Sequence, residues 1–163
     1  MKKTILLIIV LVLALVSFSG CVTFYKDFEL YEDAHQISSI QVYYTDDWFY
    51  MKSGSLNEFY DCVQSVKTVE QSYHQEIVDI LQEIEYRYSV FFLMASDPEF
   101  DLHGYIIEVR YNSGARQFLS ESLTCTLDAN GKVVDSQDGG IDDEIWYSLL
   151  LKCAAPEWPS LQS

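Results

Sequence analysis

Hydrophobic residues recur at helical spacing in two segments of the chain. The first segment, 72–88, carries an apolar stripe on one face of a 3.6-residue repeat: Tyr73, Ile77, Ile80, Leu81, Ile84 and Tyr88. Ser72 and Gln75 stand where a capping box would place them at the start of this helix. The second segment, 141–153, repeats apolar residues every four positions, with acidic residues in its first turn and Lys152 in its last, which suits the helix dipole. The pattern therefore predicts two amphipathic helices.

Elsewhere apolar and polar residues alternate, as they do in half-buried strands. The predicted strands are, in chain order, 38–45, 58–66, 105–111, 117–127 and a return strand that begins at Lys132. Residues 48–51 either extend the first strand or form the edge of a hairpin, and 89–94 form either a further strand or a buried connection. The Asn130-Gly131 pair predicts the hairpin that joins the last two strands.

The resulting order, β-β-α-(β)-β-β-β-α, contains more hairpins than βαβ units. We therefore expect an α+β fold in which a small antiparallel sheet has both helices packed on one face. The chain has the length of one ordinary domain. We expect that single domain at 37–155, with a tether before it at 21–36 and a C-terminal tail after it at 156–163.

The start of the chain follows a different pattern. Lys2 and Lys3 precede an uninterrupted apolar run from Ile5 to Val16, which small and polar residues follow up to Cys21. This is the layout of a secretory signal. A membrane-spanning anchor needs about 20 apolar residues, more than this run supplies. An uncleaved anchor, cleavage by ordinary signal peptidase and a buried helix of a cytosolic protein remain as alternatives.

The segment Phe18-Ser19-Gly20-Cys21 resembles the lipobox of the type II signal peptides of bacterial lipoproteins, with Phe18 bulkier than the usual Leu. The resemblance implies cleavage between Gly20 and Cys21, which makes 1–20 the signal peptide. It also implies a thioether-linked diacylglycerol on Cys21. At roughly 0.8 kcal/mol per buried CH2, two acyl chains hold a protein stably at a bilayer. The implied location is the outer face of the cytoplasmic membrane, or the outer membrane of a bacterium that has two membranes.

The mature part of the chain also resembles, more loosely, small Gram-positive lipoproteins of unassigned function. The likeness is carried by the strand sequence YIIEVRY at 105–111 and by Asp143-Glu144-Ile145-Trp146 in the last predicted helix. It implies no activity and no ligand.

The chain is strongly acidic. It has 10 basic and 25 acidic residues, a net charge of −15, and loss of both leader lysines leaves 8 against 25, or −17. Nucleic acid is therefore not expected as a partner, because phosphate binding requires clustered Lys and Arg. Anionic lipid headgroups repel such a domain, so the membrane contact is expected to depend on the diacylglycerol. The acidity suits either a cationic partner or plain solubility.

Few residues suggest chemistry. The odd set Cys62, Cys125 and Cys153 contains no CxxC spacing, so we expect three buried thiols or one disulfide with one thiol left over. The three histidines are scattered, and no GxSxG, HExxH, P-loop or GxGxxG motif occurs. The acidic residues of 135–144 do not follow the EF-hand spacing. We therefore expect no catalytic residue, no metal site and no cofactor.

Aromatic residues are dense between 43 and 50. Alternation leaves Tyr43, Trp48 and Tyr50 as a candidate recognition surface, since aromatic faces stack on sugars and peptides. Packing in the core or at a sheet edge is the alternative.

The sequence as a whole indicates a lipid-anchored, non-enzymatic binding or accessory module at the cell envelope, with an unidentified envelope protein or ligand as its partner. An immunity or inhibitor lipoprotein against a cationic toxin or peptide, and an envelope hydrolase without a recognisable motif, are the alternatives.

Overall fold

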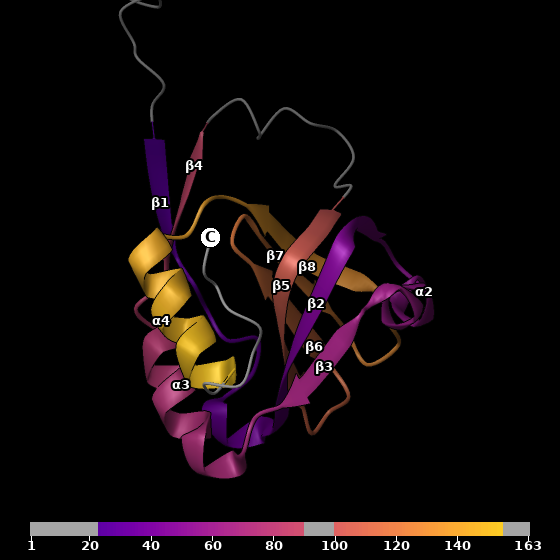
Figure 1. Cartoon of the computed structure of the whole chain (residues 1–163), viewed down its shortest axis with the longest axis horizontal. Helices are drawn as coiled ribbons and strands as arrows, with labels where there is room; N and C mark the ends of the chain where they lie inside the picture. Colours follow the sequence, from indigo (N-terminus) through magenta and orange to yellow (C-terminus); the bar gives the residue numbers. More distant parts are fainter. Residues whose placement is uncertain (1–22, 90–99, 155–163) are drawn as a thin grey trace, which may run out of the picture.

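The computed structural model describes residues 23–89 and 100–154 (Figure 1). Within these residues an antiparallel sheet has the strand order β3-β2-β5-β6-β7-β8. Its strands are β2 (Ile37–Met51), β3 (Ser65–Thr68), β5 (Phe100–Tyr111), β6 (Arg116–Ser120), β7 (Leu123–Leu127) and β8 (Val133–Asp138). Two more strands, β1 (Thr23–Asp27) and β4 (Glu85–Ser89), pair with each other as a separate ribbon.

Three α-helices pack around the sheet in the described part of the chain. They are α2 (Leu56–Cys62), α3 (His74–Leu81) and α4 (Asp143–Ala154). Short 3-10 turns, η1 (Ala34–Gln36) and η2 (Gln71–Tyr73), precede β2 and α3. The predicted α+β class is confirmed. No described helix is long and apolar enough to cross a bilayer.

One face of the sheet is covered by α3 and α4, which lie side by side in Figure 1. Ile77 and Leu81 of α3 and Leu149 of α4 are fully buried against the sheet. Ile40 and Val109 supply the strand side of the same core. The prediction that both helices pack on one face is therefore confirmed.

The opposite face carries a second core, closed by α2. Phe59 of α2 is fully buried and makes aromatic contacts with Tyr43, Phe49 and Phe118. The prediction of a strand at 58–66 is wrong for its first half, because Leu56, Phe59, Tyr60 and Val63 recur at the i, i+3, i+4, i+7 spacing of a helix. Only its end, in β3, is a strand.

Two other predicted elements have different bounds. The helix expected over 72–88 ends at Leu81, and its capping box does not form, because Tyr73 is the N-cap and makes no side-chain cap bond. The chain then enters β4, whose backbone pairs with β1. The strand expected over 117–127 is a hairpin, β6 and β7, with its turn at the exposed residues Glu121 and Ser122.

The segment predicted as a tether contributes to the fold. Residues 23–27 form β1, and Phe28 is buried in the core below α3. The chain then crosses β6, where the Gln117 side chain donates to the Glu29 carbonyl at 2.8 Å. The leader, Cys21, residues 90–94 of the element expected at 89–94, and the tail at 156–163 all lie outside the described residues.

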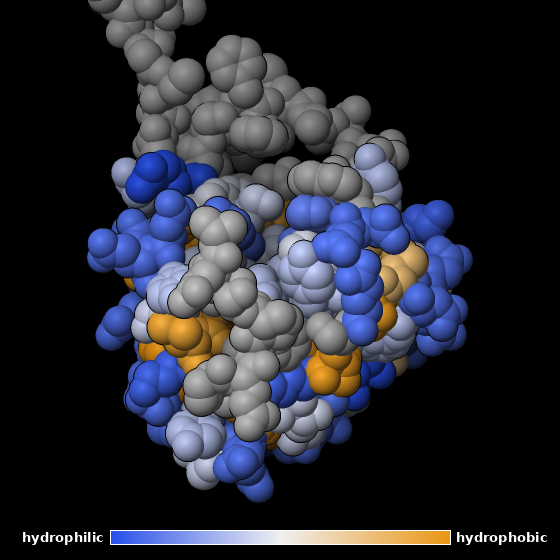
Figure 2. All heavy atoms as spheres, in the orientation of Figure 1, coloured by the Kyte–Doolittle hydropathy of each residue, from blue (hydrophilic) through white to orange (hydrophobic). Residues whose placement is uncertain are grey.

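The face seen in Figure 2 is mostly hydrophilic, and its hydrophobic patches are small and separate. Exposed apolar side chains include Leu151 on α4 and Val66 on β3. Isolated exposed apolar residues of this kind are ordinary on protein surfaces.

Candidate functional site

A fully buried carboxylate lies at the centre of the sheet. Glu108 in β5 has no solvent exposure, and four side chains donate hydrogen bonds to its two oxygens. Oε1 accepts from Tyr60 Oη at 2.6 Å and from Arg116 Nη1 at 3.2 Å. Oε2 accepts from Tyr43 Oη at 2.6 Å and from Arg110 Nη2 at 2.9 Å. We call Glu108, Arg110, Arg116, Tyr43 and Tyr60 the Glu108 cluster.

Strand register brings these side chains together. Glu108 and Arg110 are two residues apart in β5, so they point to the same face. Arg116 in β6 is the direct cross-strand partner of Arg110. Tyr43 comes from β2, the other neighbour of β5, and Tyr60 from α2 above this face. The cluster therefore depends on three adjacent strands and on one helix.

The two arginines converge on Tyr60. The guanidinium carbon of each lies 5.7 Å from the centroid of the Tyr60 ring. Arg110 Nη2 donates to Tyr60 Oη at 3.3 Å, and Arg116 Nη1 donates to the same oxygen. Like charges directly opposite each other on a sheet destabilise it. The carboxylate between them offsets one of the two positive charges.

Burial and charge keep three groups of the cluster, the two phenols and Arg110, protonated. Burial, with the negative charge of Glu108, raises the pKa of Tyr60 to about 12. The same causes raise the pKa of Tyr43 above its usual range. Desolvation alone would lower the pKa of Arg110, but the hydrogen bond and charge of Glu108 outweigh it, so that pKa is raised. Both phenols are therefore protonated donors, and Arg110 is charged, at neutral pH.

Both arginines have N–H donors that form no hydrogen bond within the described part of the chain. Arg110 bonds through Nη2 only, and its Nε is buried without a partner in the described part of the chain. Among the described residues, Arg116 bonds through Nη1 only. The side chains are 30% and 29% exposed, whereas Glu108 is inaccessible. The solvent-accessible part of the cluster thus includes both arginine side chains.

The predicted recognition surface does not form as one patch. Tyr43 is only 2% exposed, so its assignment to the surface is corrected. Its face of β2 is covered by α2, which the sequence did not predict. Tyr50 is 52% exposed, but the irregularity between Thr45 and Phe49 shifts the register, and Tyr50 points away from the core that holds Phe49. Trp48 lies in β2, and its side chain is outside the described ones.

The cysteines divide into two kinds. Cys62, Cys125 and Cys153 are all free thiols, so no disulfide joins them. Cys62 at the end of α2 is exposed, which corrects the expectation of three buried thiols. Burial raises the pKa of Cys125 and of Cys153 to about 12. These two are packing residues, not nucleophiles.

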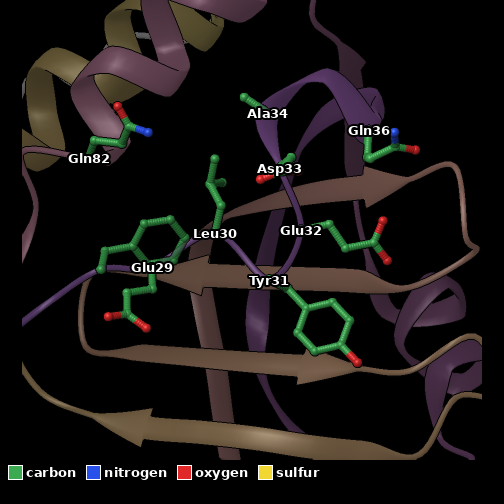
Figure 3. Close-up of a pocket in the computed structure, with 9 residues that line it drawn as sticks. Glu29, Leu30, Tyr31, Glu32, Asp33, Ala34, Gln36 and Gln82 are labelled. Atoms are coloured by element: carbon green, nitrogen blue, oxygen red, sulfur yellow. The ribbon is translucent and has the colours of Figure 1, made fainter.

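A second concave feature lies beside the segment that follows β1. Figure 3 shows this hollow, of about 750 Å³, between residues 28–36 and Gln82 at the end of α3. Its carboxylates, Glu29, Glu32 and Asp33, spread apart in the view and do not converge on one point. Across residues 23–89 and 100–154, no group of three or more His, Cys, Asp and Glu side chains is placed to hold a metal ion.

The sequence contained a signal for the Glu108 cluster. In YIIEVRY, the alternate positions Ile106, Glu108 and Arg110 mix one apolar with two charged residues, and Arg116 follows a turn. Alternation alone assigns such charges to solvent, because it does not show that a helix covers their face.

No family model, no curated protein and no solved structure matches the chain.

Proposed function

We propose that the chain is a bacterial lipoprotein, held at the outer face of the cytoplasmic membrane by diacylglycerol on Cys21, whose domain is a non-enzymatic binding or accessory module. The observation that carries the proposal is the leader, in which two lysines, an apolar run and Ser19-Gly20-Cys21 follow in the order of a type II signal peptide.

The place of Thr23, the first described residue, in the fold supports this anchor. The first described residue, Thr23, is two positions after Cys21 and pairs with Ser89 at the end of the β1–β4 ribbon. In Figure 1 this end of the ribbon points away from α3. A lipid on Cys21 would hold the ribbon next to the bilayer and leave the helices and the sheet outside it.

The Glu108 cluster supports binding in preference to catalysis. Both oxygens of Glu108 accept hydrogen bonds, and the raised pKa values of Tyr43 and Tyr60 keep their protons in place at neutral pH. General acid–base catalysis needs groups with a pKa near the working pH. The cluster fixes charges in position and is not suited to moving protons.

An immunity or inhibitor lipoprotein against a cationic toxin or peptide is the second candidate. It is favoured by the net charge of −17 for the mature chain, with 8 basic and 25 acidic residues, and by the acidic lining of the hollow in Figure 3. Capture of a basic protein from envelope extracts, in a complex that dissociates at high salt, would favour this candidate over a general accessory role.

Metabolic labelling with a tagged fatty acid tests the anchor. Cys21→Ser should abolish the label and leave an unprocessed precursor, because serine has no thiol to form the thioether. Cys62→Ser, at an exposed cysteine, is the matched control and should label as the wild type does. Label retained by Cys21→Ser would refute the proposal.

A further inference from the structure

We propose that Arg110 and Arg116 form a binding site for an oxyanion, the carboxylate or phosphate group of a ligand. The inference deepens the proposed function by naming the chemistry that the module recognises. It rests on that function only in treating the domain as a binding module, and it does not depend on the lipid anchor.

Charge balance is the first argument. The cluster holds two guanidiniums and one carboxylate, so one positive charge is not compensated within it. No second carboxylate lies within ion-pair distance of either arginine in the described chain. Neutralising Glu108 requires only one arginine. A second one, placed directly opposite the first across β5 and β6, costs repulsion that a bound anion would relieve.

Unused donors are the second argument. A guanidinium has five N–H donors in a planar fork that fits the two oxygens of a carboxylate or phosphate. In Arg116 only Nη1 is engaged, which leaves the edge formed by Nε and Nη2 without a partner among the described residues. In Arg110, Nη1 is likewise without a partner there. An oxyanion can accept from both side chains.

Accessibility is the third argument. Glu108 and Tyr43, which hold the guanidiniums from inside the fold, are buried, while 30% of the Arg110 and 29% of the Arg116 side chain reach solvent. The inner contacts fix both guanidiniums in advance, so little side-chain freedom is lost when a ligand binds. The site is therefore preorganised for an anion that arrives from solvent.

The distribution of arginines in the chain also supports an anion site at the cluster. The chain has only three arginines, and the cluster holds two of them in a protein with 25 acidic residues. The third, Arg87, is exposed on the β1–β4 ribbon. The cluster therefore places two guanidiniums side by side on one sheet face, and Arg87 provides an internal reference of the same residue type.

The experiment is a nuclear magnetic resonance titration of the mature chain in detergent micelles, following the side-chain Nε–H signals of its arginines. Inorganic phosphate and acetate are the two probes, each compared with chloride at equal ionic strength. We expect saturable shifts of the Arg110 and Arg116 signals and none of Arg87. A response to phosphate alone assigns a phosphate-bearing ligand, and a response to acetate alone assigns a carboxylate.

Arg116→Lys keeps the charge and removes the fork, so binding of the responding probe should weaken about tenfold. Arg87→Lys is the matched control and should bind as the wild type does. Cooperative thermal unfolding of both variants shows that the fold is kept. Absence of a saturable shift with either probe, equal shifts of Arg87, or an unchanged affinity in Arg116→Lys would overturn the site. Loss of the lipid anchor in the labelling experiment would leave this result unaffected.

Discussion

The two faces of the main sheet are built on different principles. The face under α3 and α4 is closed by apolar side chains such as Ile77, Leu149 and Val109. The face under α2 begins in the same way, with Phe59 and Phe118, but continues into the Glu108 cluster. The core under α3 and α4 contains buried neutral hydrogen bonds, such as that from Tyr111 to Gln117, while the core under α2 adds a buried, hydrogen-bonded charge.

This difference shows how a single strand can serve two purposes. In β5, Ile107 and Val109 point into the helix-covered core, and the intervening Glu108 points to the opposite face. A buried charge is tolerated only when it is paired and hydrogen-bonded. The arginines and tyrosines around Glu108 meet that requirement, and they give this face the solvent-accessible charges that the helix-covered face lacks among its core residues.

The largest predicted effect removes the charge at the centre of the cluster. Glu108→Gln should lower the free energy of unfolding by about 3 kcal/mol, because it leaves two opposed guanidiniums without their carboxylate. This value is at the lower end for buried ion pairs, since the arginines are 30% and 29% exposed. Chemical denaturation provides the measurement.

Glu121→Gln, at an exposed turn residue, is the matched control and should change the free energy of unfolding by no more than about 0.5 kcal/mol. Added phosphate should restore part of the stability of Glu108→Gln, because an anion can then take the place of the carboxylate. A loss no greater than that of the control would show that the two faces do not differ in the way described.

A smaller effect is expected when one tyrosine hydroxyl is removed from each of the two cores. Tyr43 and Tyr86 are equally buried, but the Tyr43 hydroxyl bonds Glu108 and Arg110, whereas the Tyr86 hydroxyl has no partner in the described chain. Tyr43→Phe should cost about 1.5–3 kcal/mol, the value of a hydrogen bond to a charged group. Tyr86→Phe should leave stability unchanged or raise it, because an unpaired buried hydroxyl is itself unfavourable.

Denaturation of the two phenylalanine variants side by side measures this contrast. Each variant serves as the control for the other, since the same atom is removed from a site of the same burial. Equal losses in stability would mean that the hydroxyl of Tyr43 gains nothing from the cluster.

The smallest effect is a difference in thiol reactivity, which reports whether each core excludes a reagent and involves no change in stability. Cys125 lies in the core under α2 and Cys153 in the core under α3 and α4. Both should resist a thiol reagent in the native protein, while the exposed Cys62 reacts. In the lipid-modified protein, where Cys21 is a thioether, a Cys62→Ser variant should therefore show no reactive thiol until it is unfolded. Native labelling of either buried cysteine, detected by peptide mass mapping, would show that its core opens.

The helix-covered face could be predicted from the sequence. The stripe Ile77, Ile80 and Leu81 and the four-residue repeat of α4 locate both helices, and YIIEVRY locates β5. Periodicity is informative there because each element has one buried and one exposed side. The residue at which the first helix ends is less predictable. The β1–β4 pairing ends the helical part of the first stripe, and this contact between distant segments leaves no local signal.

The face under α2 could be predicted only in part. Tyr60 and Cys62 also fit an alternating pattern, which predicts a strand and obscures the helical spacing from Leu56 to Val63. Without that helix, Tyr43 and Glu108 are assigned to solvent, and the cluster is lost with it. The lipid anchor differs from the Glu108 cluster because it is predicted from the sequence alone. The leader predicts it directly, and the described residues do not include Cys21.

The proposal that the chain is a lipid-anchored module is tested most directly by mass spectrometry of the native protein extracted from membranes. The account predicts an N-terminal peptide that begins at Cys21 and carries the mass of a diacylglycerol. An intact leader, or an N-terminus beyond Cys21, would contradict it.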